Sequence, residues 1–189
     1  MKNLSFLLFF LCSFVGLAQE KSNIESIVNS FINSTIEGDY DKLLLITYPK
    51  LFDFFPREQL KKTMNQTLVN EDFEISFNKI DPKIVVEDIK TIEGNRFTRI
   101  QYQNSLSMRF FNEIEMEPEA FLNILKSNFK EGKFSFDKKT NTFKIDTTSY
   151  LLGINDEITQ GEWKFINIDG DQNIIKLLLD ERIIKELEL

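Results

Sequence analysis

The chain has 189 residues, a net charge of −7, one cysteine and no histidine. The lack of histidine excludes a classical hydrolase triad and histidine-ligated metal sites. The acidic balance argues against nucleic acid or an anionic membrane surface as a partner. No motif for a cofactor is present, so no cofactor is expected.

The first eighteen residues have the pattern of a secretory signal peptide. Lys2 supplies a positive charge, residues 4–15 are apolar, and Gly16 to Ala18 place small residues before a predicted cleavage between Ala18 and Gln19. The apolar run is shorter than the ~20 residues that a permanent membrane span needs. We therefore expect a secreted or periplasmic protein without stable membrane insertion.

The only cysteine, Cys12, lies inside this apolar run and follows Leu11, where lipoprotein processing requires a small residue. Lipidation is therefore not expected. Without residues 1–18, which carry one charge, 171 of the 189 residues remain, with a net charge of −8 and no cysteine. Residues 19–189 have the size of a single domain, and that domain has no disulfides and no thiol chemistry.

The domain is predicted to open with three helices. Apolar residues at helical spacing predict the first over 22–37, with Ser22 and Glu25 as a capping box. Asp39 is suited to cap a second short helix that runs through Leu43, Leu44 and Ile46 and is interrupted at Tyr48-Pro49. A third is predicted over 56–69, with proline in its first turn.

After Asn70 the apolar residues alternate, which predicts a first strand with Phe73, Ile75 and Phe77 on one face and an end at Asp81-Pro82. A second strand is predicted over 84–92 and a long strand over 96–111. One face of the long strand carries Thr98, Ile100, Tyr102, Asn104, Leu106, Met108 and Phe110, and the other carries Arg99, Gln101, Gln103, Ser105, Ser107 and Arg109. One face is thus expected to pack on helices while the other meets water or a partner. A homodimer formed through this strand is one alternative.

The rest of the chain predicts a helix over 117–131, strands over 133–137, 142–152 and 161–168, and a helix over 174–187. Helices followed by long antiparallel strands indicate an α+β fold. We expect the helices to gather on one face of a curved antiparallel sheet, with N-terminal helices packed on the sheet, an extra helix between strands and a C-terminal helix.

Several short segments carry a family resemblance: Phe31-Ile32-Asn33, Glu37 to Leu43, Pro49-Lys50-Leu51, Glu58-Gln59-Leu60 and Gly161 to Ile166. Together they resemble secreted bacterial proteins of the NTF2-like, cystatin-like α+β superfamily. The resemblance implies a cone-shaped sheet around helices with a pocket at its mouth. Some members are isomerases or dehydratases, and others are non-catalytic binding or accessory domains. No catalytic motif of the family matches, so no catalytic residue is carried over.

Aromatic and basic side chains are the candidates for ligand binding. Tyr48, Tyr102 and Trp163 suit a small-ligand pocket, because each has an apolar body and a polar tip, but core packing is the stronger interpretation of these residues. Arg99, with Arg96 and Arg109 on the same strand, is suited to receive a carboxylate or an acidic partner. The alternative for the arginines is cross-strand ion pairing to residues such as Glu87.

Asp169, Asp171 and Asn173 stand at calcium-loop offsets, with Asp180 at the closing twelfth position. Ile174 occupies the sixth position, where such a loop needs glycine. A turn followed by a helix cap at Asn173 explains the same residues, so no metal ion is expected.

Asp39, Asp41 and Asp53 are acids near the predicted mouth of the cone. A buried carboxylate beside a tyrosine would abstract a proton, as in ketosteroid isomerase, although capping and solvation also explain these residues. The sequence most favours a non-catalytic binding or accessory module for a small ligand or a protein partner. The alternatives are an isomerase or lyase of the ketosteroid-isomerase type with an Asp/Tyr pair, and a structural dimer-forming module.

Overall fold

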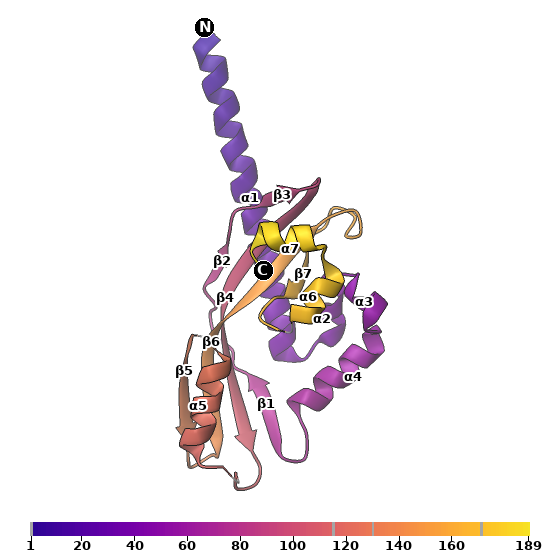
Figure 1. Cartoon of the computed structure of the whole chain (residues 1–189). Helices are drawn as coiled ribbons and strands as arrows, with labels where there is room; N and C mark the ends of the chain where they lie inside the picture. Colours follow the sequence, from indigo (N-terminus) through magenta and orange to yellow (C-terminus); the bar gives the residue numbers. More distant parts are fainter. Residues whose placement is uncertain (1, 115, 130, 171) are drawn as a thin grey trace.

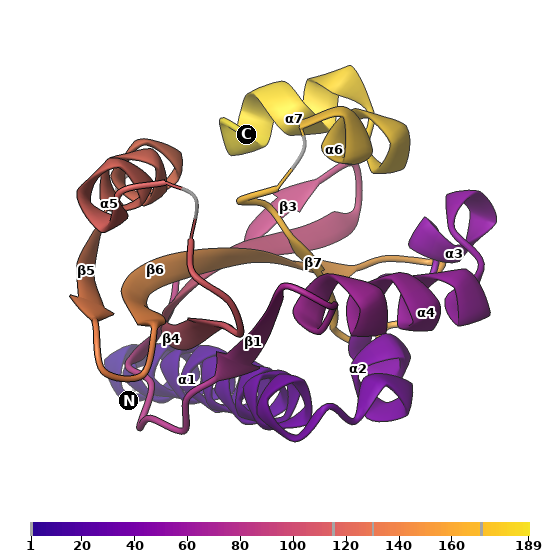
Figure 2. The same cartoon turned by 90° about the horizontal axis from the view of Figure 1, so that it is seen from below.

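The computed structural model describes residues 2–114, 116–129, 131–170 and 172–189, with side chains from residue 18 onward. Within these ranges the chain forms a seven-stranded antiparallel sheet with helices on both sides (Figures 1 and 2). The expected α+β class is therefore confirmed.

The first helix, α1 (Lys2–Glu37), is continuous and projects at its N-terminal end beyond the rest of the molecule (Figure 1). The predicted start at Ser22 is wrong for the full chain. Leucine-rich sequence favours helix, and no proline or close pair of glycines interrupts residues 2–37, so the helix continues through this point. It ends at Gly38, whose φ of 69° suits glycine. Among the described residues, no helix is long and apolar enough to cross a membrane.

Three short helices follow: α2 (Tyr40–Ile46), α3 (Leu51–Phe54) and α4 (Arg57–Leu68). The predicted second and third helices are confirmed, and α3 was not predicted. As expected, Asp39 caps α2, because its carboxylate accepts a hydrogen bond of 3.1 Å from the backbone N–H of Lys42.

The next strands are β1 (Phe73–Phe77), β2 (Ile84–Val86), β3 (Lys90–Ile92) and β4 (Asn95–Phe110). The prediction of one strand over 84–92 is wrong, because it is divided into β2 and β3. Both pair with β4, but Val86 to Lys90 spans one residue more than the opposite stretch from Phe97 to Ile100. The extra residue forces a bulge between the two short strands.

The second half of the chain contains α5 (Pro118–Asn128), β5 (Gly132–Asp137), β6 (Thr142–Asn155) and β7 (Lys164–Asn167). These elements match the predicted ones apart from their ends. Strands β4 and β6 form a long ribbon with unbroken pairing from Arg96–Asn155 to Arg109–Thr142. Strands β1, β2 and β3 pair with β4, and strands β5 and β7 pair with β6.

The chain ends in two helices, α6 (Gln172–Leu178) and α7 (Glu181–Leu187). The prediction of one helix over 174–187 is wrong, because Asp180 has an extended backbone and acts as the N-cap residue of α7. The break lets each short helix turn its own apolar residues inward. Ile175 and Leu178 of α6 and Ile183 of α7 are all buried.

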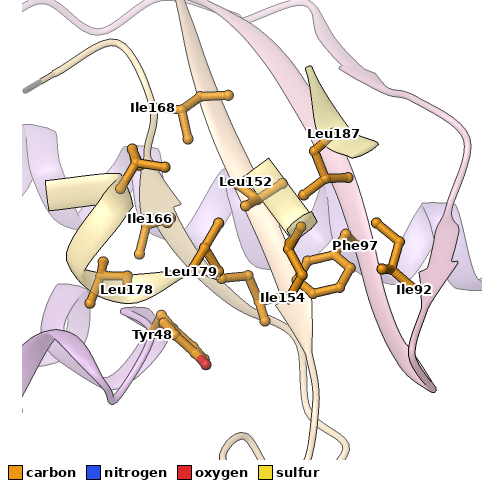
Figure 3. Packing of buried hydrophobic residues seen from close by; sticks show 12 residues of the cluster. Tyr48, Ile92, Phe97, Leu152, Ile154, Ile166, Ile168, Leu178, Leu179 and Leu187 are labelled. Atoms are coloured by element: carbon orange, nitrogen blue, oxygen red, sulfur yellow. The ribbon is translucent and has the colours of Figure 1, made fainter. Parts of the chain in front are cut away.

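The core lies on both faces of the ribbon. On one face, Leu152 and Ile154 pack under α6 and α7 (Figure 3). On the other, Ile100 and Leu151 pack against the buried stripe of α1. The expectation that the helices gather on one face is therefore wrong. Figure 2 shows α1 on one side of the sheet and α6 and α7 on the other.

Candidate functional site

A cleft opens at the outer edge of β6, between α5 and the α6/α7 pair. Strand β5 pairs with β6 only as far as Thr147, and β7 begins pairing only at Leu151. The residues between them, 148–150, thus have no strand on that side. A cavity of about 660 Å³ occupies this gap and is lined by β4, β6, the end of α5, the segment after β7 and the C-terminal residues.

Arg99 reaches the cleft from β4. Its guanidinium lies 6.0 Å from the centre of the Tyr150 ring, at the outer limit of a cation–π contact. Its Nε is buried and has no hydrogen-bond partner among the described residues. Within the same part of the chain, its side chain makes no ion pair. Arg99 therefore brings an unpaired positive charge to the cleft and keeps a buried donor without a partner among the described residues.

The two other arginines of β4 are paired. Arg96 bonds to Glu20 at the base of α1, and Arg109 forms an ion pair of 3.0 Å with Glu74 of β1. Neither pairs with Glu87, the partner suggested by the sequence. Arg99 thus differs from its neighbours in having a cavity where they have a carboxylate.

Asp169 lies beside the outer edge of β6 and bonds to that edge where no strand pairs with it. Its Oδ2 accepts a hydrogen bond of 2.7 Å from the backbone N–H of Tyr150, and its own N–H donates to Asn167 at 2.8 Å. Burial by the cleft walls raises the pKa of the Asp169 carboxyl, and the Tyr150 bond and the charge of Arg99 offset only part of this rise. Asp169 therefore holds the cleft edge and has the shifted pKa often found at functional sites.

A second hollow, a groove of about 520 Å³, adjoins the cleft and shares Glu131, Thr147 and Thr148 with it. Its floor belongs to the polar face of β4. There Ser105 donates a hydrogen bond of 2.6 Å to Asp146, and Asn78 donates one of 3.0 Å to Ser105. The two hollows together form a polar depression along the ribbon.

The aromatic candidates lie elsewhere. Tyr102 and Trp163 are buried against α1, and Tyr48 is buried in the other core cluster, under α6. Burial raises the pKa of Tyr102 to about 12, while Trp163 donates a hydrogen bond of 3.2 Å to Glu20. The structure does not bring these three side chains together, and none lines the cleft.

An Asp/Tyr pair does exist, at a place that the sequence did not predict. The Tyr48 hydroxyl donates a hydrogen bond of 2.7 Å to Asp156, and burial together with that carboxylate raises the pKa of Tyr48. Asp156 also accepts a hydrogen bond of 2.9 Å from the backbone N–H of Thr159. This pair lies outside the cleft and joins the segment after α2 to the β6–β7 loop.

The other acids considered from the sequence have separate positions. Asp39 caps α2, Asp41 forms an ion pair of 2.6 Å with Lys61, and Asp53 is exposed on α3. Of the calcium-loop residues, Asp169 lines the cleft, Asn173 belongs to α6 and Asp171 lies outside the described residues. Among the described residues, no group of three acidic, cysteine or histidine side chains is arranged to hold a metal ion.

No family model matches the chain, and no curated protein matches it. Function is therefore inferred from the cleft itself. Sequence reasoning identified Arg99 as a ligand candidate but missed Thr148 and Tyr150, because nothing in the alternation of β6 indicates that its edge is uncovered at these positions. The predicted ends of β5 and β7 could have indicated that the edge of β6 is uncovered between them.

Proposed function

We propose that this protein is a secreted or periplasmic, non-catalytic binding module that takes a small carboxylate-bearing ligand in the cleft beside Arg99. The observation that carries the proposal is the guanidinium of Arg99, which lines the cleft and makes no ion pair within the described residues, while its buried Nε has no hydrogen-bond partner there. An unsatisfied buried donor costs ~1–3 kcal/mol. A ligand carboxylate in the cleft would give this guanidinium a partner of opposite charge, because guanidinium and carboxylate groups match in hydrogen-bonded pairs.

The placement of the domain in the NTF2-like superfamily is part of the same proposal. Its support is the resemblance of sequence segments such as Glu37 to Leu43 and Gly161 to Ile166 to that superfamily. Secretion is supported by the pattern of residues 1–18. N-terminal sequencing of the exported protein should give a chain that begins at Gln19, and a chain that retains Lys2 would contradict export by cleavage.

An isomerase or lyase is the second candidate, and one observation favours it. The raised pKa of Asp169 in a cleft is a property of a general base. The binding function is preferred because the aspartate is already engaged by Tyr150 through a 2.7 Å hydrogen bond. Chemical analysis of a bound ligand after long incubation separates the two, since a binding module returns its ligand unchanged.

The binding function is tested by calorimetric titration of acetate, succinate and N-acetylglycine into the exported protein and two variants. Arg99→Gln removes the cleft cation, and Arg109→Gln removes a cation from the same strand that is 52% exposed in its side chain and lies outside the cleft. We expect at least one carboxylate to bind the wild type and Arg109→Gln equally, and Arg99→Gln about tenfold to a hundredfold more weakly. Equal binding to all three proteins, or no carboxylate binding at all, would contradict the proposal.

A further inference from the structure

The described residues around the cleft are mainly acidic. Among the described lining residues, Glu131, Asp169 and Glu188 are acidic and Arg99 is the one base. The whole chain also carries a net charge of −7. Because such a surface repels anions at long range, a ligand that offers only a carboxylate approaches Arg99 against the field of the protein.

Arg99 and Asp169 face the same cleft without pairing to each other. The structure shows no ion pair between them, and Asp169 uses Oδ2 to bind the backbone of Tyr150. A ligand with only an ammonium group would leave the Arg99 donor unsatisfied, and one with only a carboxylate would leave the acids uncompensated. A ligand that carries both groups satisfies both sides.

The size of the depression indicates more than one amino acid. At about 30 Å³ for a water-sized group, a 660 Å³ cleft accommodates roughly twenty non-hydrogen atoms, which is two to three amino-acid residues. The adjoining groove adds 520 Å³ and is also acidic, with Asp81, Glu131 and Asp146 against Lys133. An elongated ligand with cationic groups would fit the cleft and the adjoining groove together.

The uncovered edge of β6 adds a way to hold a main chain. Tyr150 directs both of its backbone groups to the outer edge, since its N–H donates to Asp169 and its C=O accepts from Ile168 at 3.1 Å. Alternate residues of an antiparallel strand direct these groups the same way, so Thr148 also faces the cleft with its backbone. Peptide main chains bind exposed strand edges by this kind of pairing.

We propose that the cleft binds a short peptide, with the free α-carboxylate of the peptide at Arg99 and its N-terminal ammonium group toward the acidic residues Glu131, Asp169 and Glu188. This inference rests on the proposed function, because it names the ligand class of the same cleft. The edge of β6 at Thr148 pairs with the peptide main chain, and the groove receives its continuation.

Calorimetric titration of trialanine into the exported protein tests the proposal, with N-acetyl-trialanine, trialanine amide and free alanine as matched probes. Amidation removes the carboxylate and should weaken binding about tenfold to a hundredfold in the wild type but not in Arg99→Gln. Acetylation removes the ammonium group and should weaken binding about twofold to fivefold. That loss should disappear in the variant with Glu131→Gln, Asp169→Asn and Glu188→Gln.

The two proposals fail in different ways. If N-acetyl-trialanine binds as tightly as trialanine, the ligand is a simple carboxylate, and this inference is overturned while the proposed function stands. If free alanine binds as tightly as trialanine, a single amino acid is the ligand and the peptide is excluded. If no probe binds and Arg99→Gln changes nothing, both proposals are overturned.

Discussion

The two ends of the β4–β6 ribbon share one pairing register but are covered differently. At the closed end, which comprises residues 95–102 and 149–155, both faces are buried, and Ile100, Leu151 and Leu152 have no exposed surface. At the open end, residues 103–110 and 142–148, one face packs against α5 while the other stays polar. The difference teaches that strand pairing alone does not decide where a core or a site forms.

The cleft lies where the closed end passes into the open end. Helices α6 and α7 cover one face of the ribbon as far as Leu152, and beyond it that face continues with Tyr150, Thr148 and Asp146. A side chain at this boundary, such as Arg99, is shielded by the last covering helices yet still reaches solvent. The boundary therefore provides a partly dry environment for a charged group.

Truncating a side chain on the face covered by α6 and α7 should have the largest effect on the free energy of unfolding. This effect should differ sharply between the closed and open ends of the ribbon. Leu152→Ala removes a fully buried side chain and should lower the free energy of unfolding by about 2–5 kcal/mol. Lys144→Ala lies on the same face at the exposed open end and should change it by less than about 0.5 kcal/mol. Denaturant unfolding measures both. Similar losses at the two positions would contradict the comparison.

Loss of the Tyr48 hydroxyl should weaken the closed end by a smaller amount. Tyr48→Phe removes the 2.7 Å hydrogen bond to Asp156 and leaves a half-buried carboxylate with one partner fewer. We expect the free energy of unfolding to fall by about 1.5–3 kcal/mol, because the bond is to a charged group. Thermal unfolding of Tyr48→Phe against wild type measures this. A variant as stable as wild type would show that the bond is not needed to hold the β6–β7 loop.

Replacement of Arg99, at the boundary between the two ends, should raise the stability of the protein. Arg99→Met removes the unsatisfied Nε and keeps an apolar stem, so the ligand-free protein should become more stable by about 1 kcal/mol. Carboxylate binding should be lost at the same time. Urea unfolding without ligand measures the gain, with Arg109→Met as the control on the same strand. A loss of stability in Arg99→Met would mean that the guanidinium has a structural role.

The smallest expected effect is a pH dependence that comes from Asp169. Its folded-state pKa is raised above the ordinary value of 3.8 by burial, so the folded protein binds this proton more tightly than the unfolded chain does. Wild-type stability should therefore fall, relative to Asp169→Asn, as the pH rises from about 3.8 through the raised pKa. Thermal melts of both proteins across acidic pH measure this, and parallel curves would contradict the raised pKa.

Ionisation of Asp169 should affect peptide binding in the opposite direction to stability. An ammonium group requires ionised Asp169, so trialanine should bind more weakly as the pH falls through the raised pKa. The asparagine variant should show a flatter profile over this range. The two opposite slopes together distinguish a titration of Asp169 from general acid unfolding.

Local patterns in the sequence were sufficient to predict most helices and strands. The two faces of β4 follow from strict alternation, and the turn before it follows from Gly94, whose φ is 85°. Helices α2, α4 and α5 follow from caps and spacing that involve only neighbouring residues. These features are set by interactions a few residues long, which a single sequence displays directly.

The tertiary structure decided where strands and helices are interrupted and where the cleft forms. The division into β2 and β3 depends on the register with β4, and the break at Asp180 depends on how α6 and α7 fit the sheet. Arg99 was a ligand candidate from the sequence, and Asp169 was considered only for calcium. Their meeting in one cleft depends on where β5 and β7 stop pairing with β6, because contacts between distant segments are not encoded in any local period.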